Sequence, residues 1–118
     1  MAEGTGQTGD AVAAARAGVA RRDEALADAD RRLAATLSAA HRVAEDAVRR
    51  LEAVRGDIDR AVAGYAADTS TGAAELARFL LARQREIADV VADAEAEARA
   101  KTAVLKELTA TYAAQNIR

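Results

Sequence analysis

One turn signal interrupts the interior of this chain. It is the run of small and polar residues Asp68, Thr69, Ser70, Thr71 and Gly72. The 118 residues contain no proline, so nothing else in the interior has the composition that usually ends a helix. The pattern therefore predicts one chain reversal between two long elements.

The composition indicates that both elements are helices. Alanine accounts for 35 of the 118 residues, and Ala, Glu, Lys, Leu and Arg together account for 70. Such a bias, combined with heptad periodicity, is typical of long helices and coiled coils. Leu, Ile, Val and Phe make up only 22 residues, so the core between the helices must be thin and rich in alanine.

The turn signal divides the chain into two helices of unequal length. We expect a first helix over about 10–67, a turn at 68–72 and a second helix over about 72–115. Residues 1–9 contain three glycines and little apolar surface to bury, and they are predicted to be a disordered N-terminal tail. Residues 10–118 then form a single domain.

Local signals at the helix ends support these bounds. Asp10 is expected to cap the first helix, because its carboxylate can accept hydrogen bonds from the free amides of the first turn. Ser70 or Thr71 can cap the second helix, with Glu75 near its positive end. Gly56 weakens the first helix, which leaves open whether that helix is continuous or kinked there.

A heptad pattern places an apolar seam on each helix. In the first helix the d positions are Val12, Val19, Leu26, Leu33, Ala40, Ala47, Val54 and Ala61. Its a positions are Arg16, Asp23, Asp30, Leu37, Ala44, Leu51, Ile58 and Tyr65. In the second helix the a positions are Ala73, Leu80, Ile87, Ala94, Lys101 and Leu108. Its d positions are Leu76, Arg83, Val90, Glu97 and Val104, flanked at e by Val91, Leu105 and Tyr112.

Reversal near residue 70 places side by side those positions whose numbers add up to about 140. Residues before about 24 then have no partner within the hairpin. The same pairing sets an acidic stretch against a basic one, namely Asp89, Asp93, Glu95 and Glu97 against Arg42, Arg49, Arg50 and Arg55. Two interpretations remain open: ion pairs across the hairpin, or a solvated charged face on each helix.

A two-helix hairpin with few large side chains is marginal as a monomer. Ordering the backbone costs about 1 to 2 kcal/mol per residue, and little apolar surface is available to offset it. Alanine along the seams permits close helix approach. We therefore predict an all-α fold, a long antiparallel two-helix hairpin resembling a coiled coil, completed by dimerisation into a helical bundle.

Several function classes are disfavoured by composition. The chain has no cysteine, which excludes disulfides and thiolate zinc sites. A net charge of −2 with interspersed signs argues against nucleic-acid binding. No apolar run is long enough to span a membrane, and the start MAEGTGQTG does not resemble a signal peptide. We expect a cytoplasmic protein as synthesised, with export by another route left open.

The candidate chemical groups do not form an active site. His41 and Glu45 share a helix face, but two ligands do not make a metal site. Ser38 and Ser70 lie outside any nucleophile motif. We expect no enzymatic activity, no cofactor and no metal.

The richest stretch for binding runs from Leu76 to Val91. It is either hairpin core or a wider apolar surface buried against a second chain. The candidate interaction residues are Leu76, Phe79, Leu80, Leu81, Ile87, Val91 and Tyr112. Phe79, Leu81 and Val91 lie off the strict seam, which makes them the first candidates for such a contact.

Residues 72–94, GAAELARFLLARQREIADVVADA, resemble an actinobacterial and mycobacterial helical family, the domain of unknown function DUF4226. The alanine-rich first helix and Tyr112 extend that resemblance. It implies a small helical protein and brings no catalytic residues with it.

A broader likeness is to the WXG100 and Esp-like helical hairpins of type VII secretion, which pair as antiparallel dimers. The turn lacks their Trp-x-Gly, and Tyr65 and Tyr112 are not followed at the fourth position by an acidic residue. The sequence therefore leads to two hypotheses. One is a helical interaction module that self-associates or pairs with another helical protein, linked through this likeness to type VII secretion. The other is a coiled-coil spacer with a projecting N-terminal helical arm.

Overall fold

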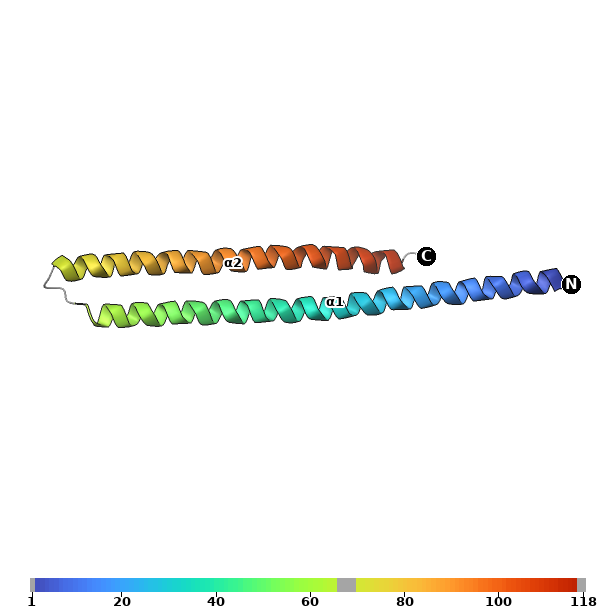
Figure 1. The fold of residues 1–118 in the computed structure, drawn as a ribbon, viewed down its shortest axis with the longest axis horizontal. Coiled ribbons are helices and arrows are strands. Elements are labelled where there is room, and N and C mark those ends of the chain that lie inside the picture. Colours follow the sequence, from blue (N-terminus) through green and yellow to red (C-terminus); the bar gives the residue numbers. More distant parts are fainter. Residues whose placement is uncertain (1, 66–69, 117–118) are drawn as a thin grey trace. The chain divides into compact units, whose positions relative to one another are not determined.

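The computed structural model describes residues 2–65 and 70–116, and the side chains of 6–65 and 71–116. It contains two helices, α1 (Ala2–Ala63) and α2 (Ser70–Asn116), as Figure 1 shows. No strand occurs within the described ranges. The predicted fold class, an all-α hairpin of two long helices, is confirmed.

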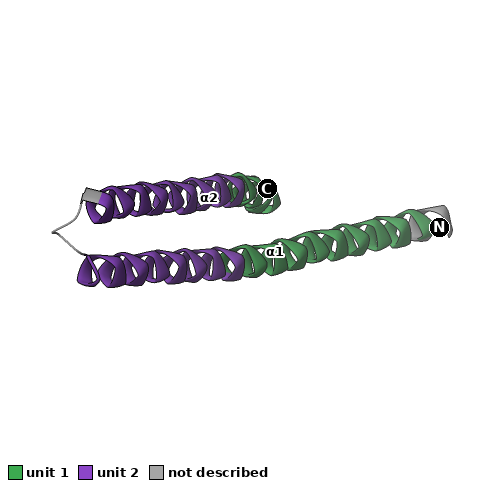
Figure 2. Cartoon of the chain, turned by 60° about the vertical axis from the view of Figure 1, so that its left-hand side comes forward, with its two compact units in different colours: residues 1–37, 103–118 green, residues 38–102 purple. Residues whose placement is uncertain are grey.

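The chain divides into two compact units. Unit 1 comprises residues 1–37 and 103–118, and unit 2 comprises residues 38–102 (Figure 2). Each unit contains one segment of α1 and one segment of α2.

Contacts between the helices fix their direction in unit 2. The Arg50 guanidinium lies 3.4 Å from the Asp93 carboxylate, and that of Arg83 lies 3.6 Å from Asp57. As the residue number falls along α1 it rises along α2, so the segments are antiparallel. Both contacts fit the predicted pairing of the two helices.

The helices of unit 1 are also antiparallel. The Arg32 guanidinium donates a hydrogen bond to the Glu107 carboxylate at 3.1 Å, and the Tyr112 hydroxyl donates one to Asp30. The order of these two contacts repeats the direction seen in unit 2.

The N-terminal boundary differs from the sequence prediction. Residues 2–9 are helical, so the predicted disordered tail is wrong, and Asp10 lies inside α1 instead of capping it. Extending an existing helix adds about one backbone hydrogen bond per residue, and no proline opposes this extension. α1 is also a single helix through Gly56.

The predicted turn falls partly outside the described residues. α1 ends at Ala63, where the Gly64 amide donates to the Arg60 carbonyl at 3.1 Å, four residues before the predicted end. α2 begins at Ser70, so the end of the predicted turn is already helical. Residues 68 and 69 lie outside the described part of the chain.

The fully buried side chains are few and small. Within the described residues, Ala29 and Leu108 are buried in unit 1, and Val54 and Val90 in unit 2, each 1 to 2% exposed. Burying a valine or leucine side chain contributes about 1.5 to 3 kcal/mol. Among the described residues, the fully buried core of each unit therefore consists of two side chains, which agrees with the thin core that the composition predicts.

The predicted seam of α1 is only partly right. Its d positions from Leu26 to Ala61 are buried or half-buried, as are the a positions Leu51 and Ile58. The a positions Leu37 and Ala44 are exposed, and the inward positions there are Thr36 and Val43 instead. An α-helix has 3.6 residues per turn, so a strict heptad drifts by about 20° per repeat. Two successive four-residue steps, from 43 to 47 and 51, correct the register.

The seam of α2 shows a similar shift near its start. The a positions Ala73 and Leu80 are exposed, and Gly72 and Phe79 take the inward places. Glu97 is exposed although it was expected at d. The expected seam positions from Ile87 onward, Glu97 apart, are half-buried or buried. No helix in the described residues is long and apolar enough to cross a membrane.

Candidate interaction surfaces

The predicted interaction residues separate into two groups. The exposed ones are Leu80, Leu81 and Val91. The half-buried ones are Leu76, Phe79, Ile87 and Tyr112. Only the first group therefore offers a substantial apolar side chain to a partner, and the second group mainly packs within its own unit.

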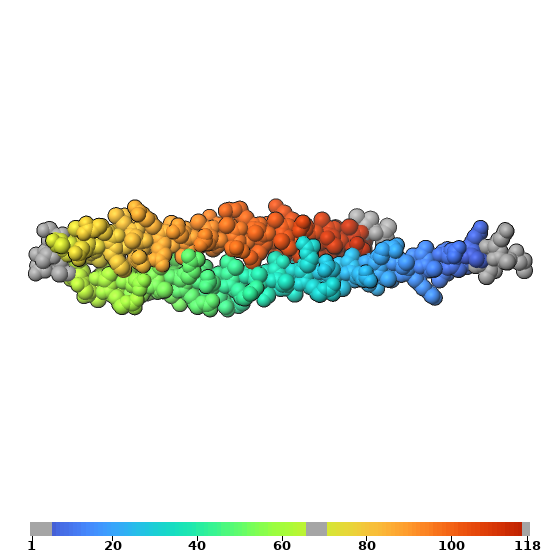
Figure 3. Space-filling view, viewed as in Figure 1, coloured from blue at the N-terminus to red at the C-terminus, as the bar shows by residue number. Residues whose placement is uncertain are grey.

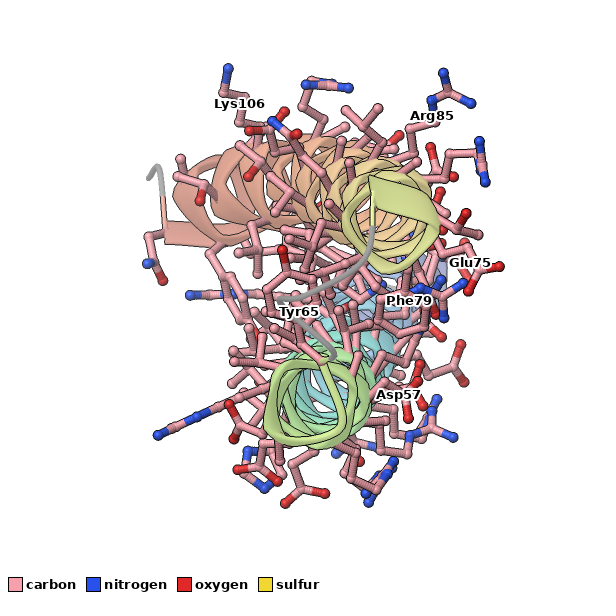
Figure 4. All side chains as sticks on the ribbon, turned by 90° about the vertical axis from the view of Figure 1, so that its left-hand side faces the viewer. Asp57, Tyr65, Glu75, Phe79, Arg85 and Lys106 are labelled. Atoms are coloured by element: carbon pink, nitrogen blue, oxygen red, sulfur yellow. The ribbon has the colours of Figure 1, made fainter. Side chains whose placement is uncertain are left out.

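Ionic contacts across the helices lie on one side of unit 2, which we call the charged face. It carries the contact of Arg50 with Asp93 and that of Arg83 with Asp57. Glu86 also binds Arg83, with 2.9 Å between the charged groups. In Figure 4, Asp57 is drawn on the same side of the two helices as Glu75 and Phe79. The pair of Arg50 with Asp93 is largely exposed and contributes at most about 1 kcal/mol, whereas Arg83 and Asp57 are half-buried.

Phe79 packs beneath the charged face. The Arg83 guanidinium carbon lies 5.1 Å from the centre of the Phe79 ring, within the range of a cation–π contact. The Arg83 Nε is buried with no hydrogen-bond partner. Arg83, which the heptad pattern placed at a d position, thus covers the only phenylalanine and shields that ring from a partner chain.

A shallow groove lies along the charged face. It has a volume of about 610 Å³ and forms where small side chains leave space between the helices. Its floor includes Ala47, Ala94 and the buried Val90, and ionic side chains line its rims. The predicted ion pairs form here only in part. Of the four basic residues expected to face the acidic stretch, Arg50 contacts Asp93 and Arg42 lines the groove, whereas Arg49 and Arg55 pair within α1.

Six large apolar side chains of unit 2 are exposed among the described residues, and we call four of them, all except Tyr65 and Leu81, the apolar face. They are Val48 (53% exposed), Val62 (53%), Leu80 (37%) and Val91 (44%). Val48 and Val62 are not among the residues that the sequence predicts for binding. Both occupy the e position of the first-helix heptad, directly after the d positions Ala47 and Ala61. Val91 occupies the e position of the second-helix heptad. An apolar residue at e in both helices is the sequence signal that indicates these two valines.

In unit 1, α1 continues past the end of α2. Residues 6–21, which we call the arm, are exposed except for the half-buried Gly18, and Figure 3 shows no other segment over them. Val12 and Val19 project from the arm with 44% and 57% exposure. The prediction that residues before about 24 lack a partner in the hairpin agrees with this arrangement.

Tyr112 joins the two helices of unit 1 through its hydroxyl. The hydrogen bond to Asp30, together with burial and the carboxylate charge, raises the pKa of Tyr112 above its ordinary value of 10.0. The folded chain therefore favours the protonated phenol. The contribution to stability is fully present below pH 10 and is lost as the pH rises through the higher pKa of the folded state.

We expect a Tyr112→Phe variant to lack this contribution. The difference in free energy of unfolding between parent and variant should be constant below about pH 9 and shrink above pH 10. Urea denaturation at a series of pH values measures it. A difference that stays constant up to pH 12 would contradict the assignment.

His41 and Glu45, which share a face of α1, contact each other. His41 Nε2 lies 2.7 Å from a Glu45 carboxylate oxygen, and both side chains are largely exposed. In the described residues, no group of three His, Cys, Asp or Glu side chains is placed to hold a metal.

An ion pair within α2 changes the acidity of one carboxyl group. The Lys101 ammonium donates a hydrogen bond to Glu97 at 2.8 Å, and this bond lowers the pKa of Glu97 from its ordinary value of 4.5.

Comparisons with known proteins identify a family and no activity. The family model described as "Domain of unknown function (DUF4226)" matches residues 5–117. "Uncharacterized protein MT0028" of Mycobacterium tuberculosis (strain CDC 1551 / Oshkosh) is 45% identical over 115 residues, which cover 95% of this chain and 96% of that protein. No solved structure matches the chain.

Proposed function

The chain belongs to the DUF4226 family, whose function is unknown, and from that premise we propose that it works as a non-enzymatic helical interaction module. In this role a hairpin binds a helical partner, which is a second copy or a different protein. The resemblance to the family, first suggested by residues 72–94, now rests on nearly the whole chain.

The exposed apolar face of unit 2 is the observation that carries this proposal. Val48, Val62, Leu80 and Val91 remain in contact with water, while the buried core of the same unit consists of two valines. At about 25 cal/mol per Å² of apolar surface, removing these side chains from water would add stability that the hairpin lacks. A helix packed on this face would supply it.

The solution mass of the purified chain tests the proposal. Light scattering over a hundredfold range of concentration, with helicity followed by circular dichroism, should give one of two results. The chain is either a helical oligomer that dissociates and loses helicity on dilution, or a partly helical monomer that awaits another protein. A fully helical monomer whose melting temperature does not depend on concentration would contradict the proposal, because such a chain needs no partner.

A second candidate function is a spacer that reaches a partner through the arm. The exposure of Val12 and Val19 favours it, because these residues repeat at a heptad spacing where α2 is absent. Deleting residues 1–24 separates the candidates. Association that survives this deletion supports the hairpin module, whereas association that is lost supports the arm.

A link to type VII secretion completes the proposal on the strength of the broader likeness to exported helical hairpins. Its test is the extracellular level of the protein in host cells with and without the secretion ATPase. We expect a fall when the ATPase is removed, and an unchanged level would exclude this route.

A further inference from the structure

We propose that the apolar face of unit 2 binds the apolar face of a second copy, with α1 of one copy packed against α2 of the other. This inference rests on the proposed function and specifies its partner and geometry. The partner is the chain itself, and the product is an antiparallel four-helix bundle formed by the two copies of residues 38–102.

The four side chains of the apolar face lie on one side of the unit. An α-helix turns by about 100° per residue. Counted from the buried Val54, Val62 and Val48 are offset by about 80° and 120°. Counted from the buried Val90, Leu80 and Val91 are offset by about 80° and 100° in the same sense.

In two antiparallel helices that pack together, side chains offset from the buried positions in the same rotational sense lie on the same side of the helix pair. The contact between Arg50 and Asp93 verifies the geometry: both residues are offset in the opposite sense, by about 40° to 60°, and their charged groups lie 3.4 Å apart. The ionic contacts between the helices and the four apolar side chains therefore occupy opposite sides of the two-helix layer. Arg55 and Asp59, which pair within α1, lie beside the valines on the apolar side.

This side of the unit has the size of a stable interface. From Ala73 to Ala98, both exposed alanines on this side, α2 rises by about 37 Å. Two helices of about 10 Å diameter then present about 700 Å², close to the 800 Å² per partner of a standard interface. The half-buried Leu51 and Ile87 border the face, so a second copy would extend the existing seam rather than start a separate one.

The alignment of residues along the two helices determines which helices meet. The contacts of Arg50 with Asp93 and of Arg83 with Asp57 define which residues lie level along the two helices. Val62 lies level with Leu80, and Val48 lies about level with Val91 and Ala94. A twofold axis parallel to the helices keeps residues at the same level, so Val62 meets the partner's Leu80, and Val48 meets the partner's Val91. Arg55, on the same face, then lies beside the uncharged Gln84 of the second copy.

The alternative twofold axis, across the hairpin, is disfavoured by charge. It would place Val62 against the partner's Val48. Arg55, which is midway between Val48 and Val62 in the sequence, would then lie on the axis. Two arginines would then face each other in the interface, and like charges there cost stability. Packing α1 on α2 avoids this conflict.

Two adjacent leucines provide the first experiment. Leu80 belongs to the apolar face, whereas Leu81 is more exposed and is offset by about 180° from Val90, away from both α1 and that face. Leu80→Glu should raise the dissociation constant of the dimer at least tenfold, and Leu81→Glu should change it less than threefold. Helicity at the highest concentration shows whether each variant still folds.

Cysteine pairs provide the second experiment, because the chain has no cysteine of its own. Each variant carries one substitution, and two variants are mixed and oxidised. Val62→Cys with Leu80→Cys should give a mixed disulfide faster than Val62→Cys with Val48→Cys. The outward Leu81→Cys, mixed with Val62→Cys, is the control and should give the slowest reaction.

The outcomes separate this inference from the proposed function. A dimer that resists Leu80→Glu, or one that cross-links 62 to 48 faster than 62 to 80, overturns the inference and leaves the interaction module standing. A partly helical monomer does the same. A fully helical monomer that is insensitive to concentration overturns both.

Discussion

Leu108→Ala should destabilise unit 1 by about 2 to 4 kcal/mol. Leu108 is 1% exposed and is the largest buried side chain of the described residues. Truncation removes its apolar burial and leaves a cavity between two helices that contact each other through few large side chains. Since small domains have limited total stability, the loss should be visible as a large fall in melting temperature.

Chemical denaturation followed by circular dichroism measures this effect, and Leu81→Ala is the matched control. The same atoms are removed at a position that is 54% exposed, so the cost should stay below about 1 kcal/mol. Equal effects of the two substitutions would show that Leu108 is not a core residue.

Val90→Asp should have the largest effect in unit 2. Val90 is 1% exposed and touches the floor of the groove, where a carboxylate would be removed from water. The substitution loses the apolar burial of valine and adds an unpaired charge, which together should cost more than about 3 kcal/mol.

The dependence on pH identifies the cause of that loss. Burial raises the pKa of a carboxyl group, so the variant should become more stable relative to the parent as the pH falls from 7 toward 4. Ala88→Asp, at an exposed position on the same helix, should cost far less and show no such recovery. A Val90→Asp chain as stable as the parent at pH 7 would contradict the assigned core.

The sequence predicted the architecture because the signals for it are local. A single turn cluster and the absence of proline define two helices, and the pairing around that turn follows from chain connectivity alone. The tail was misjudged for the opposite reason. Whether residues 2–9 are helical depends on extension from α1, which the composition of those residues does not reveal.

The candidate surface was predicted only in part because the strict heptad ignores helical drift. Leu37 was assigned to the seam and is exposed, whereas Val48 was overlooked and belongs to the apolar face. Phe79 was a leading candidate for a contact with another chain. The position of Arg83 over its ring depends on tertiary structure, which no spacing rule encodes.

Two sides of different character are the central feature of unit 2. On the charged face, two ion pairs join the helices: Arg50 with Asp93, which is largely exposed, and Arg83 with Asp57, which is half-buried. On the apolar side, the three valines and Leu80 remain exposed beside the Arg55–Asp59 pair, which lies within α1. Because the two sides differ, a second copy of the chain can pack on the apolar face while the charged face stays in contact with water.

The reaction rate of a single thiol tests this account most directly. Leu80→Cys and Leu81→Cys place the only cysteine of the chain on the apolar face or away from it. We expect a thiol reagent to modify the Leu80→Cys chain at least tenfold more slowly than the Leu81→Cys chain at high concentration, and at a similar rate after dilution. Equal rates at every concentration would contradict the claim that the apolar face is buried by a second copy.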